Sequence, residues 1–141
     1  MRKWSVLAVG ILAADQLMKF LAVQRLPSDG GRLRSVIAFA LHKNYGIAFD
    51  FPLPSWIVIP LTLMIIIGAA MALKRYRHED TMVIALMFII LGGIGNLIDR
   101  IAYGFTVDYL ILFGKSAINL SDVMILGGVV VLLIHSRRQR V

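Results

Sequence analysis

The chain has 141 residues, of which 59% are hydrophobic and 16% are charged. This composition excludes an ordinary soluble domain and indicates a small integral membrane protein, while the lack of cysteine excludes disulfide and thiolate chemistry. In a membrane protein, the formal net charge of +7 is better explained by loop residues that set orientation and attract anionic lipid headgroups than by nucleic-acid binding.

Four apolar segments come close to the length of about 20 residues that a helix needs to cross the hydrocarbon core. They predict membrane helices over residues 4–23, 56–73, 82–98 and 117–135. The first has a basic start like that of a signal peptide, but it contains Asp15 and Lys19 and lacks a small-residue cleavage site, so we expect it to remain as a helix. The fourth is long enough only if it begins near Ala117, which places Asn119 and Asp122 at the membrane boundary.

Basic residues are denser on one side of these predicted helices. Eight lie in the two tails and the second loop, namely Arg2, Lys3, Lys74, Arg75, Arg77, Arg137, Arg138 and Arg140. The asymmetry predicts that both termini are cytoplasmic and that residues 24–55 and 99–117 face outward. Because no linker or internal repeat divides the chain, we expect residues 1–141 to form one domain.

The first outer loop is too apolar for a simple connection. Residues 34–51 contain apolar side chains in partial alternation around a turn signal at Asn44-Tyr45-Gly46. This pattern predicts a small strand or hairpin near the membrane surface. An interfacial amphipathic segment is the alternative.

Ionisable residues inside the predicted helices need partners, because such a side chain costs about 2.5–3.5 kcal/mol at the bilayer centre. Asp15 and Lys19 lie at positions i and i+4, acid first, which favours an ion pair that is either a structural clasp or a support for an active site. Asn96, Asp99 and Arg100 share one face at the end of the third helix. There, an interhelical hydrogen bond and a boundary ion pair are the alternatives to a functional role.

The stretch from Gly92 to Asp122 carries the most unusual polarity of the chain. Its glycines allow close helix approach. The fourth helix opens with Asn119-Leu120-Ser121-Asp122, a pattern that helix capping alone would explain. Asp108, however, lies in an otherwise apolar run of the same outer connection, fourteen residues before Asp122. Two such carboxylates can meet at the outer end of a helix bundle.

Paired carboxylates are typical of aspartyl hydrolysis. Two of them a short distance apart share one proton, because both cannot ionise together. The ionised carboxylate takes a proton from the attacking water, and the protonated one donates to the carbonyl oxygen. A metal site from Asp99, Asp108 and Asp122 is a less favoured alternative, because the three histidines of the chain are scattered and lack the spacing of metal ligands. We therefore expect no metal and no cofactor.

Five motifs in this order resemble those of the bacterial lipoprotein signal peptidases, the signal peptidase II family of four-helix membrane aspartyl proteases. The matching segments are residues 15–19 (like DQxxK), 44–49 (like NxGxAF), 92–100 (like the family's glycine-rich segment ending in GNxxDR), 104–109 (like GxVxDF) and 119–122 (like NxAD). The resemblance implies an all-α membrane protein with four transmembrane helices and a small extracytoplasmic β-cradle. It also implies a multi-pass protein of the bacterial cytoplasmic (inner) membrane, with its active site near the outer face.

The same resemblance implies a substrate and a role for each site residue. The substrate would be a prolipoprotein with diacylglycerol on its lipobox cysteine, cut just before that cysteine by a monomeric enzyme that contacts membrane lipids and no nucleic acid. Asp108 and Asp122 would form the catalytic dyad. The supporting residues would be Asn96 and Asn119 beside the carboxylates, Asn44 and Arg100 on the substrate backbone or the tetrahedral intermediate, and Asp15, Lys19 and Asp99 in a polar network.

Three positions depart from the family pattern. Ser121 stands where alanine is usual, while Ile118 and Tyr109 stand where phenylalanine is usual. We expect the Ser121 hydroxyl to add a hydrogen bond beside the dyad and to shift the shared proton. The alternatives to a peptidase are a small four-helix transporter or channel that uses Asp15 as a proton or cation site, and a packing subunit or inactive relative.

Overall fold

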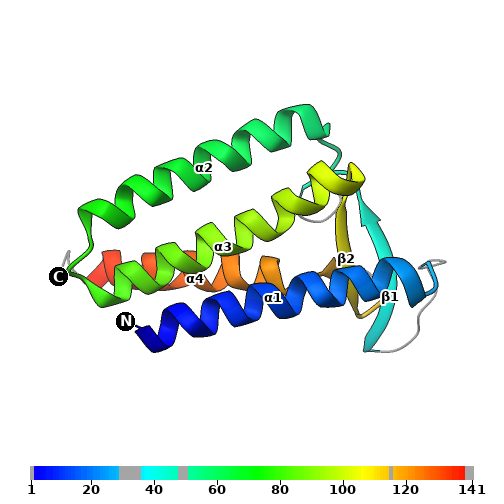
Figure 1. Ribbon diagram of the computed structural model, residues 1–141, viewed down its shortest axis with the longest axis horizontal. Coiled ribbons are helices and arrows are strands. Elements are labelled where there is room, and N and C mark those ends of the chain that lie inside the picture. The colour runs from blue at the N-terminus through cyan, green and yellow to red at the C-terminus, as the bar shows by residue number, and fades with distance from the viewer. Residues whose placement is uncertain (1, 29–35, 48–50, 115, 139–141) are drawn as a thin grey trace.

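The computed structural model describes residues 2–28, 36–47, 51–114 and 116–138. Within these ranges, four long helices form a bundle (Figure 1): α1 (Arg2–Arg25), α2 (Ser55–Arg75), α3 (Asp80–Tyr103) and α4 (Leu120–Arg138). Each helix is long and apolar enough to cross a membrane. The predicted class, a mostly helical protein with four membrane-spanning helices, is thereby confirmed.

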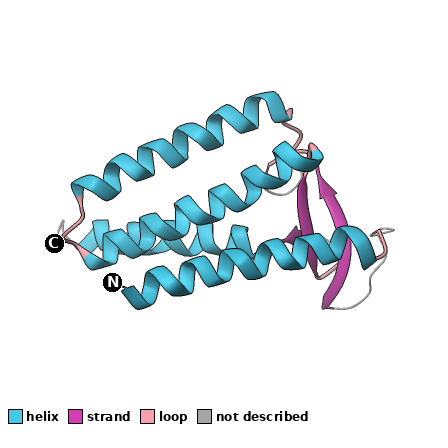
Figure 2. Cartoon of the chain, viewed as in Figure 1, coloured by secondary structure: helices cyan, strands magenta, loops and turns pink. Residues whose placement is uncertain are grey.

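A small antiparallel sheet closes one end of the bundle. Its strands are β1 (Ile37–Asn44), β2 (Thr106–Leu112) and β3 (Ser116–Ile118), hydrogen-bonded in the order β1-β2-β3. The sheet lies at the opposite end from the start of α1 and the end of α4 (Figures 1 and 2). This sheet is the small β-cradle that the family resemblance implies.

The strand predicted in the first outer loop is confirmed, but its partner lies outside that loop. Residues 37–44 pair with β2, which follows α3, rather than with a second strand in the described part of residues 34–51. Residues 34, 35 and 48–50 of that predicted segment lie outside the described residues. The physical reason is that the backbone N–H and C=O groups on both edges of β2 need hydrogen-bond partners. Strand β1 supplies them on one edge and β3 on the other.

The fourth helix begins at Leu120 rather than at the predicted residue 117. Residues 117 and 118 instead pair with β2 as part of β3. Asn119 then caps α4, because its Oδ1 accepts a hydrogen bond of 2.9 Å from the backbone N–H of Asp122. The helix reaches spanning length at its other end by continuing to Arg138.

Helix α3 packs against the other three helices and continues past the predicted residue 98 to Tyr103. It meets α4 closely, because a Cβ added at Gly92 would lie 2.5 Å from the carbonyl oxygen of Ser121, and one at Gly128 would lie 2.6 Å from that of Ala85. This contact sets the first turn of α4 against the last turns of α3, where Asn96 lies.

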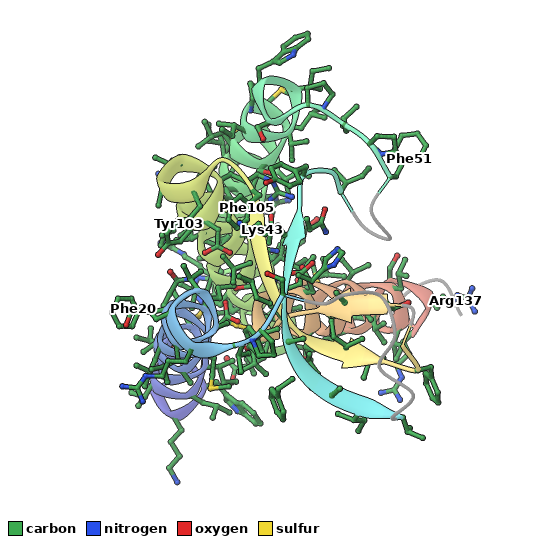
Figure 3. The ribbon with its side chains drawn as sticks, turned by 90° about the vertical axis from the view of Figure 1, so that its right-hand side faces the viewer. Phe20, Lys43, Phe51, Tyr103, Phe105 and Arg137 are labelled. Atoms are coloured by element: carbon green, nitrogen blue, oxygen red, sulfur yellow. The ribbon has the colours of Figure 1, made fainter. Side chains whose placement is uncertain are left out.

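The outer surfaces of the helices carry large apolar side chains, as expected for contact with lipid. Trp56 is 75% exposed and Leu126 is 66% exposed. Phe20 points from α1 away from the bundle (Figure 3). Polar side chains instead gather inside the bundle, next to the sheet.

Candidate active site

Asp108 lies in the middle of β2 and is buried. Its Oδ1 accepts a hydrogen bond of 2.6 Å from Asn119 Nδ2, and its Oδ2 accepts one of 3.1 Å from Asn44 Nδ2. A register shift in β1 between Phe39 and His42 sets His42 directly opposite Asp108. Asn44 is then the diagonal cross-strand neighbour of Asp108, a position from which its amide reaches the carboxyl.

Asp122 lies in the first turn of α4 and is held from two sides. Its Oδ1 accepts a hydrogen bond of 2.7 Å from Asn96 Nδ2, and its Oδ2 accepts one of 3.4 Å from the backbone N–H of Asn119. Together with the cap that Asn119 provides, this is the reciprocal arrangement of a capping box. The capping interpretation is therefore correct, and the capping residue also contacts Asp108.

One residue, Asn119, thus contacts both carboxyl groups, through its side-chain amide on Asp108 and its backbone N–H on Asp122. Burial, and after it the negative charge of Asp122, raise the pKa of Asp108 to about 7. The hydrogen bonds from Asn44 and Asn119 and the proximity of His42 act in the opposite direction and do not cancel the rise. Near neutral pH, such a pair of carboxyls can hold one proton between them.

Lys19 is fully enclosed and uses its ammonium group on three acceptors. Its Nζ lies 2.9 Å from Asp15 Oδ2, 2.8 Å from Asp99 Oδ2 and 3.0 Å from Asn96 Oδ1. Because the Asn96 oxygen is taken by Lys19, the Asn96 amino group faces Asp122. The predicted pair of Asp15 and Lys19 is therefore formed. Through Lys19 it links α1 to α3, and it contacts Asn96, which donates to Asp122.

Arg100 lies half-buried near the end of α3 and binds the loop between β1 and α2. Its Nη2 donates a hydrogen bond of 3.0 Å to the carbonyl oxygen of Gly46. The Gly46 N–H in turn donates to Asn44 Oδ1 at 2.9 Å. The guanidinium is attracted by the charges of Asp122 and Asp108. All nine predicted site residues are thus joined in one network at the sheet end of the bundle.

Two grooves differ in their relation to these residues. One, of about 890 Å³, runs between α1, α3 and α4 and is lined almost entirely by apolar side chains, with none of the predicted site residues. The other, of about 510 Å³, is formed by residues 42, 43, 45, 46 and 52–54. The ammonium of Lys43, which is one of the lining residues, lies 5.3 Å from the centre of the Phe105 ring, and this ring stacks on Tyr103 (Figure 3). The second groove borders Gly46, the residue that Arg100 holds.

The residues that the structure describes include no group of three histidine, cysteine or acidic side chains arranged to hold a metal ion. The predicted cluster of Asp99, Asp108 and Asp122 is instead divided between different partners. Asp99 accepts from Lys19 and from the backbone N–H of Val107, while the other two acids accept from asparagines. The donors around these carboxylates suit hydrogen bonding and proton sharing.

The sequence of residues 7–138 matches the family model for signal peptidase (SPase) II. The chain belongs to the signal peptidase II family. It is 32% identical over 152 residues to the lipoprotein signal peptidase of Streptococcus pneumoniae, covering 100% of this chain and 98% of that relative. It is 34% identical over 134 residues to the lipoprotein signal peptidase of Bartonella tribocorum, covering 88% and 80%. A solved structure of a bacterial membrane enzyme superposes with a TM-score of 0.82 at 20% identity, covering 99% and 90%, which shows the shared fold.

Two of the departures from the signal peptidase II pattern have a role that the sequence did not indicate. The Tyr109 hydroxyl donates to Asp15 Oδ1 at 2.9 Å, and the Ser121 hydroxyl donates to Asp15 Oδ2 at 2.6 Å. Burial and the charge of Asp15 raise the pKa of Tyr109, which keeps this hydroxyl protonated as a donor. The Ser121 hydroxyl thus adds a hydrogen bond next to Asp122 in sequence, but its acceptor is Asp15 rather than Asp108 or Asp122, and the expected shift of the shared proton stays a prediction. The available signal was that each residue stands next to a catalytic candidate in sequence.

Proposed function

We propose that this chain is an aspartyl endopeptidase of the bacterial cytoplasmic membrane. It removes the signal peptide from diacylglyceryl-modified prolipoproteins by cleaving before the lipid-modified cysteine. The proposal rests on membership of the signal peptidase II family together with one observation. Asn119 contacts both the half-buried carboxyl of Asp122 and the buried carboxyl of Asp108, whose pKa is raised to about 7.

The reaction uses the single proton shared by Asp108 and Asp122. The ionised carboxylate removes a proton from a water molecule while the water oxygen attacks the scissile carbonyl carbon, and the protonated carboxyl donates to the carbonyl oxygen. The tetrahedral intermediate then collapses: one of its hydroxyls returns a proton to the ionised carboxyl as the carbonyl re-forms, the C–N bond breaks, and the departing amine takes the proton of the other carboxyl. One carboxyl is again protonated at the end, so the enzyme returns to its starting state.

The neighbouring side chains keep the two carboxyls in place and bind the substrate. Asn44, Asn96 and Asn119 donate to the carboxyl oxygens and so fix their orientation. A guanidinium has five N–H donors. Arg100 uses one on Gly46, and the others serve the substrate backbone or the developing oxyanion. The groove beside Gly46 receives the substrate segment around the cleavage site.

The same proposal includes the topology. We place both termini in the cytoplasm and the sheet at the outer face, because the dense basic residues lie in the tails and in the loop between α2 and α3. Residues 1–141 act as one peptidase domain and as a monomer. A transport site at Asp15 has little support, because this carboxylate is enclosed by Lys19, Tyr109 and Ser121 rather than solvated.

The test is cleavage by the purified full chain in detergent. The substrates are a prolipoprotein that carries diacylglycerol on its lipobox cysteine and the same precursor without lipid. We expect cleavage of the modified precursor alone, with a product whose first residue, by mass spectrometry, is the lipid-modified cysteine. Failure to cleave the modified precursor, or cleavage at another bond, would overturn the proposal and would favour an inactive relative.

A further inference from the structure

Asp15 is the most heavily bonded carboxylate of the site, although it is not one of the dyad. Its Oδ1 accepts from the Tyr109 hydroxyl at 2.9 Å and from the backbone N–H of Leu120 at 3.0 Å. Its Oδ2 accepts from the Ser121 hydroxyl at 2.6 Å and from Lys19 at 2.9 Å. A carboxylate offers about four lone-pair sites, so every one of them is used.

The two hydroxyls on Asp15 come from the residues next to the dyad. Tyr109 follows Asp108 on β2, and Ser121 precedes Asp122 on α4. Consecutive Cα atoms are about 3.8 Å apart, so a contact that fixes one of these residues also fixes the backbone of its neighbour. In a strand, successive side chains point to opposite faces. Binding of the Tyr109 hydroxyl on one face of β2 therefore holds the Asp108 side chain on the other.

The helix start is fixed by the same group of atoms. The Leu120 N–H donates both to Asp15 Oδ1 and, at 3.1 Å, to the Tyr109 oxygen, so β2 and the first turn of α4 are bonded to each other as well as to α1. Negative charge is favourable at a helix N-terminus, which strengthens this attachment. The first turn of α4, which carries Asp122, is thereby bonded to the strand that carries Asp108.

The residues that carry these hydroxyls are closely packed and shielded from solvent. Ser121 and Asp15 are completely buried, and Tyr109 is 4% exposed. A Cβ at Gly95 would overlap the Ser121 oxygen, so only glycine at that position in α3 leaves room for the hydroxyl. The three side chains are accordingly enclosed by protein. Their positions are fixed by packing and by the hydrogen bonds among them, with little contact with solvent.

We propose that Asp15, Tyr109 and Ser121 form a hydroxyl clamp, a set of positioning residues that fixes the relative placement of the two catalytic aspartates. The inference rests on the proposed function and adds to it two residues in which this chain departs from the family pattern. The clamp acts through the backbones of β2 and α4, and none of its members touches the substrate. Loss of one hydroxyl leaves the dyad present but less well aligned, and a displacement of about 1 Å can lower a rate by about a hundredfold.

The test compares Tyr109→Phe, Ser121→Ala and the double variant in the full-length enzyme. Tyr76→Phe and Ser136→Ala serve as matched controls, because both residues are exposed at the far end of the bundle. For cleavage of the lipid-modified precursor, kcat per folded enzyme should fall by about tenfold in each single variant, while KM stays within about twofold. The double variant should lose less than the product of the two single losses, because both hydroxyls act on one carboxylate. The controls should match the parent.

Each other outcome has a definite meaning. If both single variants retain kcat within about twofold of the parent, the clamp does not position the dyad. If activity falls only in proportion to the amount of folded protein, or if KM rises with kcat unchanged, the hydroxyls have another role and the inference is wrong. An inactive parent would instead contradict the proposed function, so the two failures are distinguishable.

Discussion

Replacement of Lys19 by methionine tests whether the buried ion cluster holds the helices together. The change keeps a similar side-chain length and removes one positive charge that lies within 3.0 Å of Asp15, Asp99 and Asn96. Two buried carboxylates then face each other without a cation. Removal of one partner from a buried ion pair typically lowers the free energy of unfolding by about 3–5 kcal/mol, and we expect a loss in this range.

The measurement is equilibrium unfolding in mixed detergent, with Lys74→Met as the control because Lys74 is exposed. The control should change the free energy of unfolding by less than about 0.5 kcal/mol. The double variant Lys19→Met/Asp99→Asn should recover about 1–3 kcal/mol, because Asp99 then no longer carries an unpaired charge. If Lys19→Met alone lies within about 1 kcal/mol of the parent, the cluster does not stabilise the fold in the way we infer.

Three further predictions follow from the packing and charge of the site. Gly95→Ala should destabilise the protein by about 1–3 kcal/mol in a thermal-unfolding assay, because the added methyl group meets the Ser121 hydroxyl. Adding Ser121→Ala to the same chain should recover part of that loss. The control Gly127→Ala should have little effect, because the space around Gly127 is open. Because the raised pKa keeps Asp108 protonated below about pH 7, kcat should fall as pH rises through that value, and a profile that stays flat to about pH 9 would contradict the shared proton. Asn119→Ala should lower kcat and should also destabilise the protein by about 1 kcal/mol through loss of the cap of α4, whereas Asn119→Ser should restore the cap but not kcat. Unfolding and cleavage rates measured on both variants test this, and recovery of stability and kcat to the same extent by Asn119→Ser would contradict the dual role of Asn119.

The features that the sequence predicted well depend on contacts between residues close in the chain. Hydropathy alone locates four spans, because each helix satisfies its own backbone hydrogen bonds. The four-residue spacing of Asp15 and Lys19 predicts their ion pair, which has a length of 2.9 Å. The spacing of Asn119 and Asp122 likewise predicts the cap at the start of α4.

The features that it did not predict depend on contacts between distant residues. The pairing of β1 with β2 includes a register shift that brings His42 opposite Asp108, and no local pattern specifies such a shift. Tyr109 and Ser121 are separated from Asp15 by 94 and 106 positions. Their hydroxyls meet it only because α1, β2 and α4 pack at one end of the bundle.

The central claim, that Asp108 and Asp122 together activate water, is tested most directly by turnover of the lipid-modified precursor with Asp108→Asn and Asp122→Asn. Asparagine keeps the shape of each side chain and removes the shared proton chemistry, while Asp80→Asn at the far end of α3 serves as the control. We predict that each dyad variant stays folded and loses at least about a thousandfold in kcat, with the control unchanged. Turnover within about tenfold of the parent in either folded dyad variant would contradict the claim.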